Sequence, residues 1–279
     1  MKRELEPYQR IERSIIKKYR GELWVPFINA LKQYQLIEAG DKIAVCISGG
    51  KDSMLMAKLF QILHRFTEIP FEVIFLVMDP GYNPVNRQKI ESNAALLNIP
   101  ITVFETDIFD VADKQTHNPC YLCARMRRGH LYSRAKALGC NKIALGHHLN
   151  DVIETTVMGM FYGAQLQAMM PKLKSKNFPG MELIRPLYCI HEEDILAWRR
   201  YNGLEFIQCA CKLTEAAAHD ESTSKRQEIK SLLGRLKRDN PNIEKNIFNA
   251  IHSVSLDTFP VYKTGSRTVS FLDRYREED

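Results

Sequence analysis

Long apolar runs are missing from this chain of 279 residues, and none approaches the ~20 residues needed to span a bilayer. Its first 20 residues are charged and lack the apolar core of a secretory signal. Glu4, Glu6 and Glu12 in the same stretch argue against a transit peptide. Because a membrane span, a secretory signal and a transit peptide are all unsupported, we expect a cytoplasmic protein that does not associate with a membrane. Internal repeats are also absent.

The seven cysteines are odd in number and clustered, which argues against a disulfide framework in a cytoplasmic chain. Cys120 and Cys123 form a CxxC motif, and Cys209 and Cys211 form a CxC motif. The CxxC pair plus one distant cysteine would leave one coordination position open, as in catalytic metal centres. All four would suit a structural zinc site, and spacing alone leaves both options open. The other three lie in apolar settings typical of small buried side chains: Cys46, Cys140 and Cys189.

Positive charge is in excess, with a net charge of +6 and a pI near 8.9, and it is concentrated towards both ends. Residues 1–20 hold seven Lys or Arg against three Glu, and residues 222–238 hold six against Glu228 alone. Two basic patches favour a polyanionic partner such as nucleic acid. Two solvated helix faces are the alternative that charge alone does not exclude.

Short apolar runs alternate with segments of helical period from residue 42 onwards. We expect strands at 42–47, 71–78, 101–105 and 142–145, and helices at 53–65, 86–97, 125–138 and 152–162. This alternation predicts an α/β protein with a doubly wound parallel sheet, Rossmann-like in outline. Later segments are a loop at 165–180, a strand at 183–187, a helix at 192–201 and two more helices near the C-terminus.

The predicted domains follow from this pattern. Residues 1–38 form a helical N-terminal extension, with a helix over 11–35 that breaks before Pro26. Residues 39–212 form the α/β domain, which would bind the ligand. Residues 213–279 form a basic, helical C-terminal extension.

The motif SGGKDS, Ser48 to Ser53, stands at the carboxyl end of the first predicted strand, where α/β sheets bind their ligands. Gly49 and Gly50 let the backbone approach a phosphate, and the following helix offers unpaired N–H groups. The spacing is not that of a Walker A loop. Asp52 beside a phosphate requires a divalent cation, so we assign it to Mg²⁺, and we expect Lys51 and Asp52 to act in catalysis. A glycine turn with a serine helix cap is the structural alternative.

SGGKDS resembles the PP-loop of the ATP pyrophosphatase superfamily, also called the adenine nucleotide alpha hydrolase fold. Four further stretches are similar to the tRNA-cytidine 2-sulfurtransferase family: CYLCARMRRGHLY, KIALGHHLND, MFYGAQLQAMMPKL and IRPLYCIHEEDI, which start at residues 120, 142, 160 and 184. Together with the first they cover most of the chain from Leu36 to Cys211. Each is moderately specific alone, and the five in this order are highly specific.

The resemblance implies a [4Fe-4S] cluster as the metal centre, with Cys120 and Cys123 as two of three ligands. The family pattern around the third resembles PCxxCG, whereas this chain has a CxC that is one residue shorter. We take Cys211 as the third ligand, with Cys209 as the alternative.

The resemblance also places His147 and Asp151 of the GHHxxD pattern beside ATP, with Asp151 as a ligand of Mg²⁺ or phosphate. The backbone of Met78, at the tip of the second predicted strand, would hold the adenine. Packing in the protein interior is the alternative role for Met78 and for His147.

The implied activity is enzymatic: ATP adenylates the C2 oxygen of a cytidine in a tRNA anticodon loop, and sulfur replaces it. The implied partners are tRNA and a sulfur donor such as a cysteine desulfurase, and a homodimer is compatible with the sequence. Two alternatives stay open: another PP-loop enzyme that acts on tRNA, and a zinc- or redox-responsive nucleic-acid-binding module without catalysis.

Overall fold

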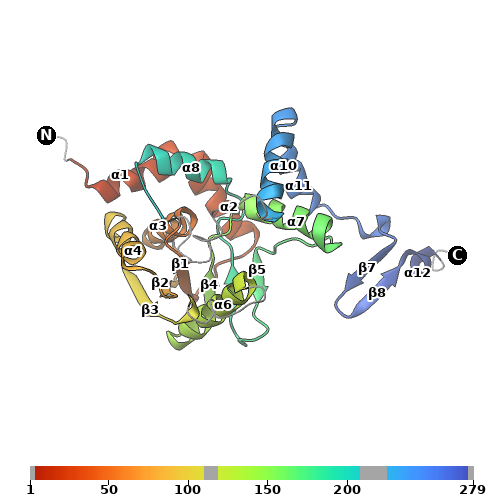
Figure 1. Ribbon diagram of the computed structural model, residues 1–279, viewed down its shortest axis with the longest axis horizontal. Coiled ribbons are helices and arrows are strands. Elements are labelled where there is room, and N and C mark those ends of the chain that lie inside the picture. Colours follow the sequence, from red (N-terminus) through yellow and green to blue (C-terminus); the bar gives the residue numbers. More distant parts are fainter. Residues whose placement is uncertain (1–3, 110–118, 208–224, 276–279) are drawn as a thin grey trace. The chain divides into compact units, whose positions relative to one another are not determined.

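The computed structural model describes residues 4–109, 119–207 and 225–275. It divides the chain into two compact units, Met1–Ile229 and Lys230–Asp279. The first unit contains a six-stranded sheet in the order β3-β2-β1-β4-β6-β5 (Figure 1). The domain boundary predicted between residues 212 and 213 lies outside the described residues and stays a prediction.

The sheet is parallel except at one edge. Its parallel strands are β1 (Lys42–Ile47), β2 (Glu72–Asp79), β3 (Ile101–Glu105), β4 (Lys142–Ala144) and β6 (Glu182–Ile184). β5 (Lys172–Lys174) pairs antiparallel with β6, in a segment that we expected to be a loop. The antiparallel edge strand leaves the predicted α/β architecture intact, since mixed sheets of this kind are common.

Helices cover both faces of the sheet, as the doubly wound prediction requires. Ile43, Val45 and Ile47 of β1 pack in one core cluster with α3 (Lys51–Phe66), α4 (Pro84–Leu96) and α8 (Glu192–Tyr201). Ala44 and Cys46, the alternate residues, pack on the other face with α6 (Pro119–Ala137). An unbroken apolar run in β1 is therefore explained by burial on both faces.

The N-terminal extension is helical but irregular. α1 (Pro7–Arg13) is followed by two π-helical segments, η1 (Ser14–Lys18) and η2 (Arg20–Trp24), and then by α2 (Val25–Gln33). The expected break before Pro26 is thus spread over ten residues of wider helix. This extension belongs to the main core, because Ile15, Leu23 and Phe27 are fully buried in the same cluster as α3.

The first unit also contains α7 (Leu149–Gly163) and the start of α10 (Lys225–Asp239). The second unit continues from α10 through α11 (Ile243–Ala250), η4 (Leu256–Thr258), β7 (Val261–Thr264), β8 (Arg267–Ser270) and α12 (Phe271–Tyr275). β7 and β8 form an antiparallel hairpin, which the prediction of a helical C-terminal extension did not include. None of the helices in the described parts of the chain is long and apolar enough to cross a membrane.

Candidate active site

The chain order of the sheet creates a crevice beside β1. The chain runs outwards from β1 to β2 and β3, then returns to β4 on the other side of β1. Ligands of such sheets bind where the order reverses, outside the carboxyl ends of the strands. A pocket of about 380 Å³ lies there, between the loops that follow β1 and β4. It is lined by Cys46, Ile47, Ser48, Asp52, Ser53, Met78, Tyr82, Arg127, Leu131, Leu145, Gly146, His147, Asp151 and Arg226.

The loop after β1 is built around Gly49. Its φ of +86° is one that L side chains rarely adopt, and an added Cβ would lie 2.6 Å from Ile90 Cγ1 and 2.7 Å from Ile207 Cδ1. The Ser53 hydroxyl holds the loop from inside: it donates to Gly50 O over 3.0 Å and accepts from Ser48 N over 3.1 Å. The loop is therefore fixed at the first turn of α3, where helical N–H groups lack helical partners.

A second glycine, Gly146, brings the loop after β4 against this turn. A Cβ at Gly146 would lie 3.1 Å from Ser53 N and 3.2 Å from Asp52 C, both backbone atoms that cannot rotate away. The two loops that form the pocket can be this close only with glycine here. Gly146 was not among the predicted site residues, although its position in the GHH stretch was a usable signal.

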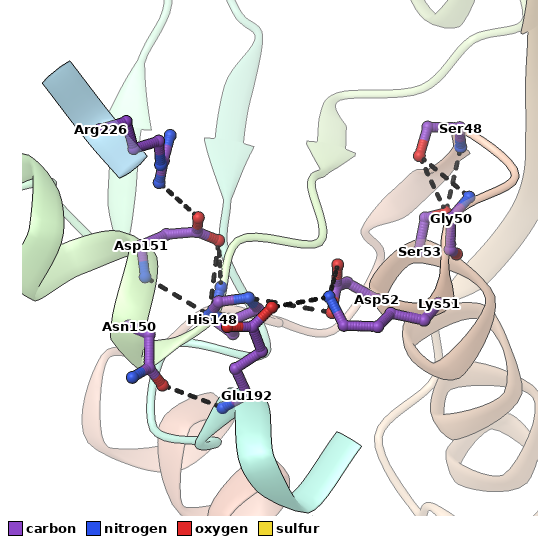
Figure 2. A network of polar contacts seen from close by, with 10 residues as sticks. All are labelled: Ser48, Gly50, Lys51, Asp52, Ser53, His148, Asn150, Asp151, Glu192 and Arg226. Atoms are coloured by element: carbon purple, nitrogen blue, oxygen red, sulfur yellow. Dashed lines mark hydrogen bonds and ion pairs between the residues drawn. The ribbon is translucent and has the colours of Figure 1, made fainter. Parts of the chain in front are cut away.

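Lys51 and Asp52 form an ionic pair at the head of α3 (Figure 2). Lys51 Nζ lies 3.1 Å from Asp52 Oδ2 and 3.0 Å from Oε1 of Glu192 at the start of α8. Burial works to lower the pKa of Lys51, but the two carboxylates outweigh it and raise the pKa, so the amine stays charged. Lys51 thereby cancels part of the negative charge beside the pocket.

The other carboxylate oxygen of Asp52 is free to take a cation. Oδ1 is buried and has no hydrogen-bond partner among the described residues, and His148 Nε2 lies 3.9 Å from it. Burial raises the pKa of Asp52, against the lowering effect of His148 and Lys51. A buried carboxylate oxygen of this kind fits Mg²⁺, which is bound through one or two carboxylates together with phosphates.

Asp151 is already committed to other groups. Its Oδ2 accepts from the backbone N–H of His148 over 3.0 Å, while the Asp151 N–H donates to His148 Nδ1 over 3.3 Å. This reciprocal pair caps the start of α7. Asp151 Oδ1 lies 2.5 Å from Nη2 of Arg226 (Figure 2). Asp52 is consequently the better placed of the two carboxylates to hold a metal.

His147 contributes a neutral ring to the pocket. Burial, reinforced by the nearby Arg185, lowers the pKa of His147 to about 4. Its Nδ1 is buried and has no hydrogen-bond partner within the described part of the chain. At neutral pH the ring can therefore hydrogen-bond a ligand without adding charge.

One side of the pocket is an apolar wall that includes Met78, near the end of β2. Met78 packs in a small cluster with Ile108, Phe109 and Cys123. Arg127 stacks over the Phe109 ring at 5.2 Å, and its buried Nε has no hydrogen-bond partner in the described residues. The wall thus joins the pocket to the helix that carries the CxxC motif.

The CxxC motif lies inside a helix. α6 begins at Pro119, ahead of the expected start at residue 125, because proline is favoured in the first turn of a helix. Cys123 is buried. The side chain of Cys120 and the whole of Cys209 and Cys211 lie outside the described residues, so the proposed ligand set stays a prediction. On either side of residues 208–224, which the structure does not describe, Ile207 packs against Gly49 and Arg226 lines the pocket.

The structure brings most of the predicted site residues together. Those that line the pocket are Ser48, Asp52, Ser53, Met78, His147 and Asp151. The pocket lining does not include Gly49, Gly50 or Lys51. The two glycines belong to the loop beside the pocket, and Lys51 adds a positive charge there. Tyr82, His148 and Arg226 were not among the predicted site residues. The GHHxxD spacing could have indicated His148, because a residue three before Asp151 suits a reciprocal helix cap.

Residues 25–214 match the family model of the PP-loop domain. A tRNA-cytidine(32) 2-sulfurtransferase from Syntrophotalea carbinolica is 37% identical over 243 residues, which are 86% of this chain and 88% of that protein. The enzyme of the same name from Citrifermentans bemidjiense is 34% identical over 229 residues, 81% of this chain and 87% of that protein. This chain belongs to the tRNA-cytidine(32) 2-sulfurtransferase family.

Membership of this family confirms the resemblance seen in the five sequence stretches. A solved structure, the U34-tRNA thiolase NcsA from Methanococcus maripaludis with its [4Fe-4S] cluster, superposes with a TM-score of 0.63. The superposition covers 81% of this chain and 76% of that one at 20% identity, so it establishes a shared fold. The predicted PP-loop fold is confirmed.

Proposed function

We propose that this protein is an ATP-dependent tRNA sulfurtransferase that replaces the C2 oxygen of a cytidine in the anticodon loop with sulfur. The supporting observation is a convergence of unpartnered polar atoms on the pocket. Asp52 Oδ1, Arg127 Nε and His147 Nδ1 are all buried and lack hydrogen-bond partners among the described residues. Buried polar groups normally have partners, so three such atoms around one pocket point to a polar ligand and a cation.

The residues divide the work of adenylation. The loop from Ser48 to Gly50 and the first turn of α3 bind phosphate oxygens through backbone N–H groups. Asp52 would hold Mg²⁺, which would neutralise charge on the phosphates when bound. The C2 oxygen of the cytidine attacks the α-phosphorus, and pyrophosphate leaves. The resulting AMP group makes C2 susceptible to substitution, because AMP leaves far more readily than oxide.

Sulfur is delivered from the side of α6. Cys120 and Cys123 lie near the N-terminus of this helix, where thiolates are stabilised, and Cys211 would complete a three-cysteine set. These three cysteines would hold a [4Fe-4S] cluster, which would supply the chemistry for carrying the incoming sulfur. The packing of Cys123 with Met78 brings this helix against the apolar wall of the nucleotide pocket. The target cytidine must leave its stack, which a single-stranded loop allows at low cost.

The test of adenylation is pyrophosphate release. Wild-type protein should release pyrophosphate from ATP only when both Mg²⁺ and tRNA are present, and Asp52→Ala should lose this activity while it keeps its fold. Release that is equal without tRNA would contradict adenylation of the base. The absence of any release would favour the binding-module alternative.

A further inference from the structure

Arg226 reaches the pocket from a segment that none of the five family-like stretches includes. It lies in the first turn of α10, and its side chain lines the pocket together with Ser48 and Asp52. The contacts of its guanidinium point to a specific role. We propose that Arg226 binds a phosphate of the nucleotide, with Asp151 and Glu154 as positioning residues that hold its guanidinium in place; this inference rests on the proposed function.

Two carboxylates of α7 bind the guanidinium of Arg226. Arg226 Nη2 lies 2.5 Å from Asp151 Oδ1, and Arg226 Nε donates to Glu154 Oε2 over 2.9 Å. These contacts use two of the five N–H donors that a guanidinium carries. The side chain is still 46% exposed. The group is therefore oriented on one side and accessible on the other, as binding of a phosphate by a planar fork requires.

The positions of the two carboxylates explain how both can bind the same guanidinium. Asp151 and Glu154 are three residues apart on α7 and so lie on one face of the helix. Glu154 is 5% exposed, and a carboxylate that is so deeply buried needs a charged partner. Lys225 lies over the ring of Tyr162 at 4.9 Å, two turns further along α7. The start of α10 is thus fastened along α7 beside the pocket.

The phosphate could belong to ATP or to tRNA, since both offer the same chemistry. From charge alone, Arg226 belongs with Lys225 and Lys230 in a surface patch for tRNA. Its place in the pocket wall, with Asp52 and with Arg127 also lining it, favours the nucleotide. Binding experiments without tRNA separate the two sources.

The experiment measures binding of a non-hydrolysable ATP analogue with Mg²⁺, and of adenosine, to the full-length protein by calorimetry in the absence of tRNA. Arg226→Ala should weaken binding of the analogue about tenfold to a hundredfold, because a charge-assisted hydrogen bond contributes in that range. Adenosine, which has no phosphate, should bind as it does to wild type. Arg226→Gln keeps polar contacts with the two carboxylates and replaces the alanine variant if that variant does not fold. It should show the same loss of affinity for the analogue. Arg235→Ala, an exposed arginine on the same helix, is the matched control and should match wild type.

The outcomes are distinct. If Arg226 only fastens α10 to α7, the variants should lose affinity for adenosine and for the analogue by the same factor, and the proposal is overturned. If Arg226 serves tRNA, nucleotide binding should be unchanged while tRNA affinity falls, which overturns it as well. If wild-type protein itself binds no ATP analogue, the proposed function fails and not merely the assignment of Arg226.

Discussion

The loop from Ser48 to Ser53 gives the sharpest structural prediction, because its Gly49 has the same φ as Gly40 but different surroundings. Gly49 and Gly40 both have φ of +86°, but a Cβ at Gly40 would meet no atom within 4 Å. At Gly49 it would lie 2.6 Å from Ile90 and 2.7 Å from Ile207. The pair Gly49→Ala and Gly40→Ala thus separates the cost of the conformation from the cost of crowding.

The magnitudes follow from these two terms. An L side chain in the left-handed region costs about 1–2 kcal/mol, which is the loss we expect for Gly40→Ala. Overpacking a buried site adds about 1–3 kcal/mol, so Gly49→Ala should lose about 2–5 kcal/mol in total. The double variant Gly49→Ala/Ile207→Ala removes one of the two crowding side chains and should recover part of the crowding term, as coupled neighbours do.

Urea denaturation followed by tryptophan fluorescence measures these losses. The chain has two tryptophans, Trp24 and Trp198, and both belong to the first unit, so the signal reports on the unit that contains the loop. Equal losses for Gly49→Ala and Gly40→Ala, or additive losses in the double variant, would refute the crowding argument.

Three further predictions concern charge and metal. Asp52→Asn should slow pyrophosphate release about a hundredfold or more through loss of the metal ligand, and a near wild-type rate would remove Asp52 from that role. Burial works to raise the pKa of Asp79, but hydrogen bonds from the Tyr82 N–H and Arg87 lower it overall. The ionised Asp79 should therefore stabilise the fold by about 1 kcal/mol at neutral pH, and denaturation curves should show the gap to Asp79→Asn closing as the pH falls below the ordinary value of 3.8. After anaerobic reconstitution the wild-type protein should bind about four irons, Cys123→Ala should bind none, and Cys46→Ala should bind as many as wild type. One stably bound zinc with no iron uptake would support the structural zinc site instead.

The sheet was predictable from sequence because a strand that is buried on both faces appears as an unbroken apolar run. The run Lys42–Ile47 reads as a buried strand, and its place before SGGKDS predicts the ligand-binding edge. β5 left no such trace, since three residues with one apolar side chain between two lysines resemble a surface loop. The hairpin of β7 and β8 escaped prediction for a related reason: its strands are short and mostly exposed.

The site was predictable to the extent that its residues are neighbours in sequence. The loop from Ser48 to Ser53 could be assigned at once, and so could the GHHxxD segment. Arg226 could not, because its contacts with Asp151 and Glu154 join segments more than seventy residues apart. In sequence it is one cation in a basic run, and only its contacts with Asp151 and Glu154 of α7 separate it from the others.

The central claim is that this protein thiolates cytidine in tRNA, and nucleoside mass spectrometry tests it most directly. Unmodified tRNA should be incubated anaerobically with reconstituted protein, ATP, Mg²⁺ and a sulfide source, then digested to nucleosides. The account predicts 2-thiocytidine that requires ATP and is absent with Asp52→Ala or Cys123→Ala. Sulfur on a different base would assign the protein to another PP-loop reaction, and tRNA that gains no sulfur with a full cluster and bound ATP would contradict the account.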